Sequence, residues 1–456
     1  MTFLLERLAE HFHAQWAKPL APEAARQGQW LTLDLIGVAI AGVKMRFPTV
    51  MRELIAAQSG AAQASLIGHP EPVPAAQAAL GNGVAGHALD MDDGYRYGGV
   101  HIGVSAIPAA LAFAQARGRG GQDYLKAITA SYELVSRLAR AMNPSHLQRG
   151  FHTTGTLGPL GAALACGLLA GLPPPALANA LGLAALQSAG LLEVLHDGAM
   201  AKPLHPGKAA QAGVLAAQLA ERGALGPRSA LEGPKGMFHA MADGVNTDAL
   251  FDGLGKQPPL ILDQYIKLHA ACRHIHPSID ALLSLMQTHG LKAQDIRAVQ
   301  VSTYPVAVDF CGSPNLPATA EGAKFSIALS LALAARHGDV AEHRYTEAEV
   351  TDAALRRWAG QVSSQAGARW AEAYPRERGA TVAITDASGR RLEEVRALAK
   401  GEPECPASEQ DLLAKFRQNA QGQPAELRQA LEAAVMGLEQ GAASSVASLL
   451  GRVAAA

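Results

Sequence analysis

The segment 153–192, which contains no Asp, Glu, Lys or Arg, constrains the fold more than any other part of this sequence. It is long enough for two membrane spans interrupted by the prolines at 173–175. Alanine and glycine dominate it, however, and the internal Asn179 and Gln187 add polar groups that a bilayer would not solvate. We therefore predict a tightly packed helical hairpin in a protein without membrane spans.

The chain up to about residue 255 has the composition of a helical protein. Ala, Leu, Glu and Gln dominate its segments, and Gly and Pro separate them. Small residues on these helices would let their backbones approach closely. The segments that best illustrate the pattern are 23–43, 122–142 and 207–222.

The composition changes near residue 260. Residues 297–304 alternate like a strand. Residues 380–385 and 390–395 flank an Asp-Ala-Ser-Gly turn, a pattern typical of a β-hairpin. Helical patterns lie between these strands, so this part of the chain is predicted to be an α+β module.

Helical patterns return after Pro406 and continue almost to the end of the chain. The predicted fold class is therefore mainly α with an α+β second domain. Residues 1–260 and 400–456 would form the all-helical domain, and residues 261–399 would form an inserted α+β lid domain.

The charge balance excludes several classes of partner. The formal net charge is −1 and the pI about 7.0, so the chain has no overall field for nucleic acid or an anionic membrane surface. Four widely spaced cysteines without a CxxC pair predict reduced thiols and a cytoplasmic location. The charged first residues indicate an amphipathic helix rather than a signal peptide. An anionic ligand would have to be bound by a local group of cations.

Residues 81–86, Gly-Asn-Gly-Val-Ala-Gly, match the GxGxxG pattern but not its context. A dinucleotide site needs a preceding strand and an acidic residue about 20 positions later. A helical pattern precedes this segment, and position 106 is alanine. We predict no nucleotide cofactor.

The segment 87–101 concentrates ionisable groups in a chain with only 17% charged residues. It contains His87, Asp90, Asp92, Asp93 and His101. Neighbouring carboxylates repel unless a cation, a proton or solvent relieves them, which indicates a functional site. A solvated acidic loop that caps a helix is the alternative.

Three further segments carry complementary chemistry. His152 lies at a threonine-rich helix start, where free N–H groups could bind an anion. Lys202 and His205 lie in a basic loop before another predicted helix, a favourable place for a carboxylate. The third segment, at the predicted domain junction, contains Lys267, His269, Arg273, His274 and His276. Burial of these cations would be costly without an anionic partner.

A metal site is the alternative interpretation. His274 and His276 with Asp90, Asp92 or Asp93 could supply ligands for zinc or iron. The sequence has no HxxxH spacing and no thiolate set, and lysines in these segments would repel a cation. We predict no metal and no other cofactor. The imidazoles and carboxylates then suit proton transfer beside a substrate carboxylate.

These motifs resemble the MmgE/PrpD family over nearly the whole chain. The matching segments are 82–93, 150–152, 202–207, 267–281 and 323–326. The resemblance implies a helical domain with an α+β lid domain, a homodimer, and cofactor-free chemistry on small di- or tricarboxylates.

The resemblance also implies roles for individual residues. The residues that match acid/base and hydrogen-bonding positions of the family's decarboxylase branch are Asp90, His101 and His152. The residues expected to bind the anionic carboxylate substrate are Lys202, Lys267, His276, His205, Cys272 and Arg273.

Two departures from the decarboxylase branch bear on the reaction. Gly94 stands where that branch has Thr, in a loop one residue longer, and Cys272 stands where it has His. The leading hypothesis is therefore a hydro-lyase of the 2-methylcitrate dehydratase type, with His152 or His101, oriented by Asp90, as the base. An epimerase of an imino- or amino-dicarboxylate is the first alternative, followed by a cis-aconitate-type decarboxylase and by a non-catalytic binding protein.

Overall fold

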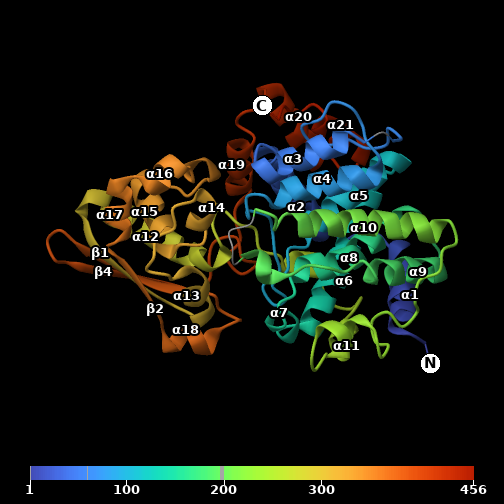
Figure 1. Ribbon diagram of the computed structural model, residues 1–456, viewed down its shortest axis with the longest axis horizontal. Helices are drawn as coiled ribbons and strands as arrows, with labels where there is room; N and C mark the ends of the chain where they lie inside the picture. Colours follow the sequence, from blue (N-terminus) through green and yellow to red (C-terminus); the bar gives the residue numbers. More distant parts are fainter. Residues whose placement is uncertain (1, 59, 196–199, 456) are drawn as a thin grey trace. The chain divides into compact units, whose positions relative to one another are not determined.

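The computed structural model describes residues 2–58, 60–195 and 200–455. The chain divides into two compact units. The first, the helical unit, comprises Met1–Ile266 and Leu412–Ala456. The second, the sheet unit, comprises Lys267–Asp411. The predicted fold class, mainly α with an α+β part, is confirmed (Figure 1).

The described residues of the helical unit form helices and no strand of a sheet. Its α-helices are α1 (Leu4–Trp16), α2 (Pro22–Gly42), α3 (Arg46–Ala56), α4 (Ala75–His87), α5 (Gly103–Arg117), α6 (Gly121–Met142), α7 (Ser145–Gln148), α8 (Thr153–Leu169), α9 (Pro174–Ala185), α10 (Leu204–Glu221), α11 (Met237–Met241), α20 (Ala425–Met436) and α21 (Ala443–Leu450). Short 3₁₀ turns are η1 (Leu192–Leu195), η2 (Thr247–Leu250) and η3 (Leu260–Asp263). Helix α19 (Glu409–Asn419) begins in the sheet unit and ends in the helical unit.

The charge-free segment forms the centre of the helical unit. Every residue of α8 is buried, and α8 packs against α5, α6, α9 and α10 (Figure 1). The predicted hairpin is confirmed, because α8 and α9 are separated by the turn that ends at Pro173. Among the described residues, no helix combines the length and the hydropathy that crossing a bilayer requires. The absence of charge therefore reflects burial on all sides of α8.

Close helix contacts in this unit depend on glycine. Gly213 of α10 faces α8, and a Cβ at this position would lie 2.6 Å from the backbone nitrogen of Ala163 and clash with the side chain of Ala162. Gly207, on the same helix, faces α4, where a Cβ would lie 2.7 Å from the carbonyl oxygen of Leu80. The small residues thus bring the α4, α8 and α10 backbones together, as their sequence predicts.

The GxGxxG segment lies inside helix α4, and residues 81–86 are all buried there. A phosphate-binding loop needs exposed backbone N–H groups at a helix start. Here the backbone N–H groups belong to the interior of a helix, so this segment does not form a phosphate-binding loop.

The sheet unit contains one four-stranded sheet with the order β2-β1-β3-β4. Its strands are β1 (Ile296–Thr303), β2 (Val362–Ala366), β3 (Ala380–Asp386) and β4 (Arg391–Arg396). Its helical segments are η4 (Arg273–Ile275), α12 (His276–His289), η5 (Ala293–Asp295), α13 (Pro305–Cys311), α14 (Ala320–Ala323), α15 (Ile327–His337), η6 (Glu342–Arg344), α16 (Glu347–Thr351), α17 (Ala353–Ala359) and α18 (Ala368–Ala373). Helix α12 packs against β3 and β4 and also contacts α15.

The predicted strand at 297–304 corresponds to β1, and the predicted hairpin corresponds to β3 and β4. Strand β3 pairs antiparallel with both β1 and β4. Strand β2 was not predicted. It pairs parallel with β1 at the edge of the sheet, and none of its residues is buried. Because an exposed edge strand buries no side chain, its sequence, Val-Ser-Ser-Gln-Ala, lacks the hydrophobic alternation on which strand prediction depends.

The packing of α10 against α8 gives a testable prediction. Replacing Gly213 with Val inserts methyl groups where a single Cβ already clashes, so we expect the free energy of unfolding to fall by about 1–3 kcal/mol. Urea denaturation of the full-length protein measures this change. The control is Gln218→Ala on the same helix, where the side chain is only half-buried. Equal stability of the two variants would contradict the close contact.

Candidate active site

The loop that follows α4 is the first part of the candidate site. Asp90 adopts a φ of 53°, the one positive φ of a non-glycine residue among the described residues, and so reverses the chain after the helix. The exposed fraction is 9% for Asp90, 0% for Asp92 and 1% for Asp93. Because all three carboxyl groups are buried, a solvated acidic loop is excluded, and each of them needs a compensating partner.

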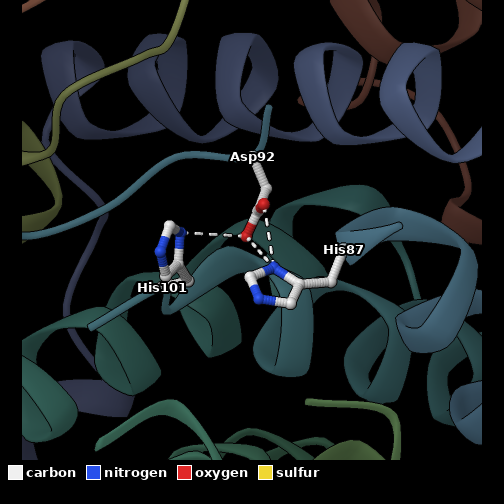
Figure 2. A group of neighbouring side chains, drawn as sticks. All are labelled: His87, Asp92 and His101. Carbon is white, nitrogen blue, oxygen red and sulfur yellow. Dashed lines mark hydrogen bonds and ion pairs between the residues drawn. The ribbon is translucent and has the colours of Figure 1, made fainter. Parts of the chain in front are cut away.

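Asp92 is the carboxylate that contacts two imidazoles (Figure 2). His87 Nδ1 lies 2.9 Å from each carboxylate oxygen, and His101 Nδ1 lies 3.1 Å from Oδ2. Burial alone would raise the pKa of Asp92, but the charge interactions and hydrogen bonds with the two rings outweigh it and hold this pKa well below its usual range. Burial lowers the pKa of His87 to about 4, so this ring is neutral at neutral pH.

His101 has two further contacts that determine its orientation. Its Nδ1 donates to the carbonyl oxygen of Asp93 at 2.8 Å, and its backbone N–H donates to Thr154 Oγ1 at 3.0 Å. Thr154 lies in the first turn of α8. The buried hairpin therefore helps to position this imidazole.

Asp93 is held in a different environment from Asp92. Its Oδ2 accepts a hydrogen bond from the Tyr132 hydroxyl at 3.0 Å. Burial, together with the negative charges of Asp92 and Asp34, raises the pKa of Asp93 to about 8. At neutral pH this group is predominantly a neutral carboxylic acid, so the two adjacent aspartates carry about one negative charge between them.

Asp90 pairs with the cation of the second candidate segment. Lys202 Nζ lies 2.5 Å from Asp90 Oδ1, and both side chains keep a small exposed fraction, 18% and 12%. Asp90 was expected to orient a histidine. In the helical unit Asp92 contacts His87 and His101, while Asp90 pairs with Lys202, so the orienting role of Asp90 stays a prediction.

His152 is the N-cap residue of α8, as its sequence predicts. Its Nδ1 lies 2.9 Å from the Nδ1 of His205, in the first turn of α10, so one ring donates a proton to the other. Burial and the charge of Lys202 lower the pKa of His152 well below its usual value and also lower that of His205. The pair is therefore neutral at neutral pH and remains close to the Lys202 ammonium group.

Sequence reasoning placed His87 and Asp92 in the candidate segment but assigned no catalytic or substrate-binding role to either of them. It also missed Lys415, which lies far away in the chain. Lys415 Nζ lies 2.5 Å from Asp34 Oδ1 and donates to the carbonyl oxygen of Met91 at 2.9 Å. This buried lysine ties the loop to α2 and α19. A lysine among polar helix residues gives no sequence signal for burial.

The candidate residues of the sheet unit form a local network of their own. Arg273 pairs with Glu402 at 2.8 Å, and its guanidinium lies 3.1 Å from His276 Nδ1. Burial and the charge of Arg273 lower the pKa of His276 well below its usual value. The expected anionic partner for this cationic segment is thus supplied partly by Glu402. Lys267 and Cys272 are also buried, with exposed fractions of 1% and 9%.

A metal ion is the remaining possibility for the imidazole cluster. In the described part of the chain, His87, Asp92 and His101 form a group whose possible ligand atoms all lie within 4.8 Å of one another. Two tetrahedral zinc ligands with bonds of about 2.1 Å lie roughly 3.4 Å apart. The observed separations of 2.9 and 3.1 Å are those of hydrogen bonds instead. The metal ligands considered from the sequence included His274 and His276. In the structure the ring of His274 contacts Tyr304, and that of His276 contacts Arg273.

The fold and the site define a mainly helical protein with a second α+β unit and a buried cluster of imidazoles, carboxylates and a lysine. Two family models match this chain: the MmgE/PrpD N-terminal domain over residues 6–249 and the MmgE/PrpD C-terminal domain over residues 269–440. The chain therefore belongs to the MmgE/PrpD family.

Three relatives illustrate the similarity. A cis-aconitate decarboxylase of Aspergillus terreus is 27% identical over 354 residues, which cover 70% of each chain. The cis-aconitate decarboxylase-like protein oryM of Aspergillus oryzae is 25% identical over 456 residues, which cover 94% of each chain. The cis-aconitate decarboxylase of Homo sapiens is 28% identical over 245 residues, 52% of this chain and 50% of the human protein.

The raised pKa of Asp93 gives a prediction for stability against pH. The folded state keeps this proton up to about pH 8, whereas the usual value is 3.8. Between these values the folded state binds more protons than the unfolded state, so this contribution to stability is present at low pH and is lost as the pH rises. Asp93→Asn removes the titration but keeps a neutral group. We expect the Tm difference, wild type minus variant, to decrease from pH 4.5 to pH 8.5.

The control for this measurement is Asp243→Asn, since the Asp243 side chain is 72% exposed. Its Tm difference from the wild type should change much less over the same range. A pH-independent difference for Asp93→Asn would show that Asp93 is ionised throughout.

Proposed function

We propose that this protein is a cofactor-independent lyase that removes a proton beside a carboxylate of a small di- or tricarboxylate. One observation carries the proposal. His101 Nδ1 faces only acceptors, the Asp92 carboxylate and the Asp93 carbonyl oxygen, so a neutral His101 keeps its lone pair on Nε2. That nitrogen can act as a general base, and the ring keeps a 13% exposed fraction.

The reaction we favour is elimination of water. The C–H bond beside a carboxylate breaks, the proton passes to His101 Nε2, and the electron pair is delocalised onto the carboxylate. The neighbouring C–O bond then breaks, and hydroxide leaves as water with a proton from a second group. The ammonium group of Lys202, which already donates to Asp90, is the candidate donor. The Asp92 carboxylate stabilises the imidazolium that forms on His101.

Lys202 and His205 are proposed to bind the carboxylate that becomes electron-rich during the reaction. Lys202 lies in the turn just before α10 and His205 in its first turn, where the helix dipole favours a negative charge. His152 contacts His205 directly and completes this group.

We also propose that four residues of the sheet unit bind substrate, because the family resemblance gives them this role. They are Lys267, Cys272, Arg273 and His276. Their burial beside Glu402 indicates that Arg273 and His276 also stabilise the unit itself. The homodimer and the cytoplasmic location are likewise proposals that follow from the resemblance and from cysteine usage.

Decarboxylation of a cis-aconitate-like acid is the second candidate, because the relatives named above are cis-aconitate decarboxylases or resemble them. The Gly94 position argues against it. A Cβ at Gly94 would clash with the Tyr265 hydroxyl, and the two residues exchange backbone hydrogen bonds of 3.1 and 2.9 Å. A threonine hydroxyl has no room there while Tyr265 keeps its place, so a ligand near residue 94 would meet different groups.

One experiment separates the candidates: proton NMR of the full-length protein in deuterated buffer with 2-methylcitrate, citrate, cis-aconitate and aspartate-derived dicarboxylates. Dehydration yields an alkene and removes the proton signal of the C–H group beside the carboxylate. Decarboxylation yields carbon dioxide and a product with solvent deuterium. Deuterium in recovered substrate without an alkene indicates an epimerase. No turnover together with no rise in Tm for any acid would overturn the proposal.

Replacement of Lys202 gives a matched pair of variants. Lys202→Met removes the ammonium group that pairs with Asp90, and we expect kcat/KM on the true substrate to fall by about 10²-fold or more. Lys208→Met is the control, because Lys208 lies six residues further along, is exposed and donates to Gln211 at 2.7 Å. Steady-state kinetics compares the two. Equal activity of both variants would remove Lys202 from the site.

The contact between Gly94 and Tyr265 is tested by a double-mutant cycle. We expect Gly94→Ala to lower the free energy of unfolding by about 1–3 kcal/mol, because the methyl group overlaps the tyrosine ring. In a Tyr265→Ala background the same change should cost less, with a coupling of about 0.5–3 kcal/mol. Urea denaturation measures all four proteins. Strict additivity would contradict the steric explanation for glycine at this position.

A further inference from the structure

One carboxylate serves two imidazoles in this site. Asp92 is fully buried, and both of its oxygens lie 2.9 Å from His87 Nδ1 while Oδ2 lies 3.1 Å from His101 Nδ1. Figure 2 shows that each ring turns one nitrogen toward Asp92 and the other away from it. The rings also meet each other edge to face, with centroids 4.9 Å apart.

The acceptors around these rings determine their tautomers. An ionised carboxylate can only accept hydrogen bonds, and so can the Asp93 carbonyl oxygen, which lies 2.8 Å from His101 Nδ1. Each Nδ1 must therefore carry a hydrogen atom. When the rings are neutral, both lone pairs lie on Nε2, on the sides that face away from Asp92.

The His87 ring has a second nitrogen that its contact with Asp92 leaves unused. Its Nε2 is buried and has no hydrogen-bond partner among the described residues, although the residue is only 2% exposed. Leaving a buried acceptor without a partner is destabilising. The His87 ring also stacks on His152, with centroids 6.0 Å apart, so it belongs to the same imidazole cluster.

We propose that Asp92 is a positioning residue that holds His87 in the Nδ1–H tautomer and, together with the Asp93 carbonyl oxygen, holds His101 in the same tautomer, and that His87 is a further binding residue of the site. His101 Nε2 then serves as the base. His87 Nε2 accepts a hydrogen bond from a hydroxyl group or a water molecule of the ligand-bound site. The assignment of the base rests on the proposed function, whereas the two tautomers do not.

The shared carboxylate also limits the charge of the pair. A single Asp92 charge can compensate one imidazolium, and a second proton on the neighbouring ring would lie within about 5 Å of the first. When His101 takes a proton from the substrate, His87 therefore remains neutral and keeps its Nε2 as an acceptor. Two imidazoles on one carboxylate thus have different roles.

The test is a long-range proton–nitrogen correlation spectrum of the full-length protein with ¹⁵N-labelled histidine at neutral pH. The chain has 16 histidines, so the signals of His87 and His101 are assigned from their loss in His87→Gln and His101→Gln. We expect protonated Nδ1 and unprotonated Nε2 in both rings of the wild type. A protonated Nε2 with a bare Nδ1 in either neutral ring would overturn the proposal.

Asp92→Ala should separate the two rings. It removes the carboxylate from His87, which is then no longer held in the Nδ1–H tautomer, while the Asp93 carbonyl oxygen still accepts from His101. We expect the Nε2 signal of His87 to move toward the protonated form and that of His101 to stay. Unchanged spectra of both rings would contradict the role of Asp92. Asp243→Asn is the surface control and should leave both rings unchanged.

Asp92→Asn keeps the shape of the side chain and is the variant to use if Asp92→Ala fails to fold. It removes the charge that stabilises an imidazolium, so we expect kcat to fall by about 10²–10⁴-fold with KM little changed. A fall in Tm with unchanged kcat and KM would reduce Asp92 to a structural residue. If the tautomers are as expected but no carboxylic acid is turned over, the proposed function fails and the positioning role of Asp92 stands.

Discussion

The buried negative charge of Asp92 is the constraint on which the rest of the site depends. A carboxylate without solvent requires donors, and here they are the Nδ1–H groups of His87 and His101. This requirement determines which nitrogen of each ring is free for chemistry. It also sets the neighbouring charges, because Asp93 avoids ionisation beside Asp92 and pairs with the Tyr132 hydroxyl instead.

Such a site needs a rigid and water-free support, and the charge-free helices provide it. Helix α8 is buried along its whole length, His152 is its N-cap, and its first turn carries the threonine that accepts from the His101 backbone. Glycines at the contacts of α10 bring the helix that begins just after Lys202 close to α4 and α8. The weakly hydrophobic, featureless segment of the sequence is thus what places the reactive residues.

The sequence was most informative where local chemistry and periodicity agree. The hairpin of α8 and α9 and strands β1, β3 and β4 all follow from composition and alternation. Prediction failed at β2, an exposed edge strand that gains its conformation from pairing with β1. Likewise nothing in its neighbourhood distinguishes Lys415 from a solvated lysine, because its burial depends on Asp34, hundreds of residues earlier.

The partners of Asp90 and Asp92 are a second feature that the sequence indicates only in part. Three aspartates within four residues indicate a site, but their spacing does not say which imidazole or ammonium group each one meets. The positive φ at Asp90 turns its carboxylate to Lys202 and leaves Asp92 to the histidines. Composition and motifs alone therefore determined the fold class, the family resemblance and the chemical groups of the site. Only the tertiary structure decided which charges pair, because ion pairs and tautomers depend on distances of a few ångströms between segments that are far apart in sequence.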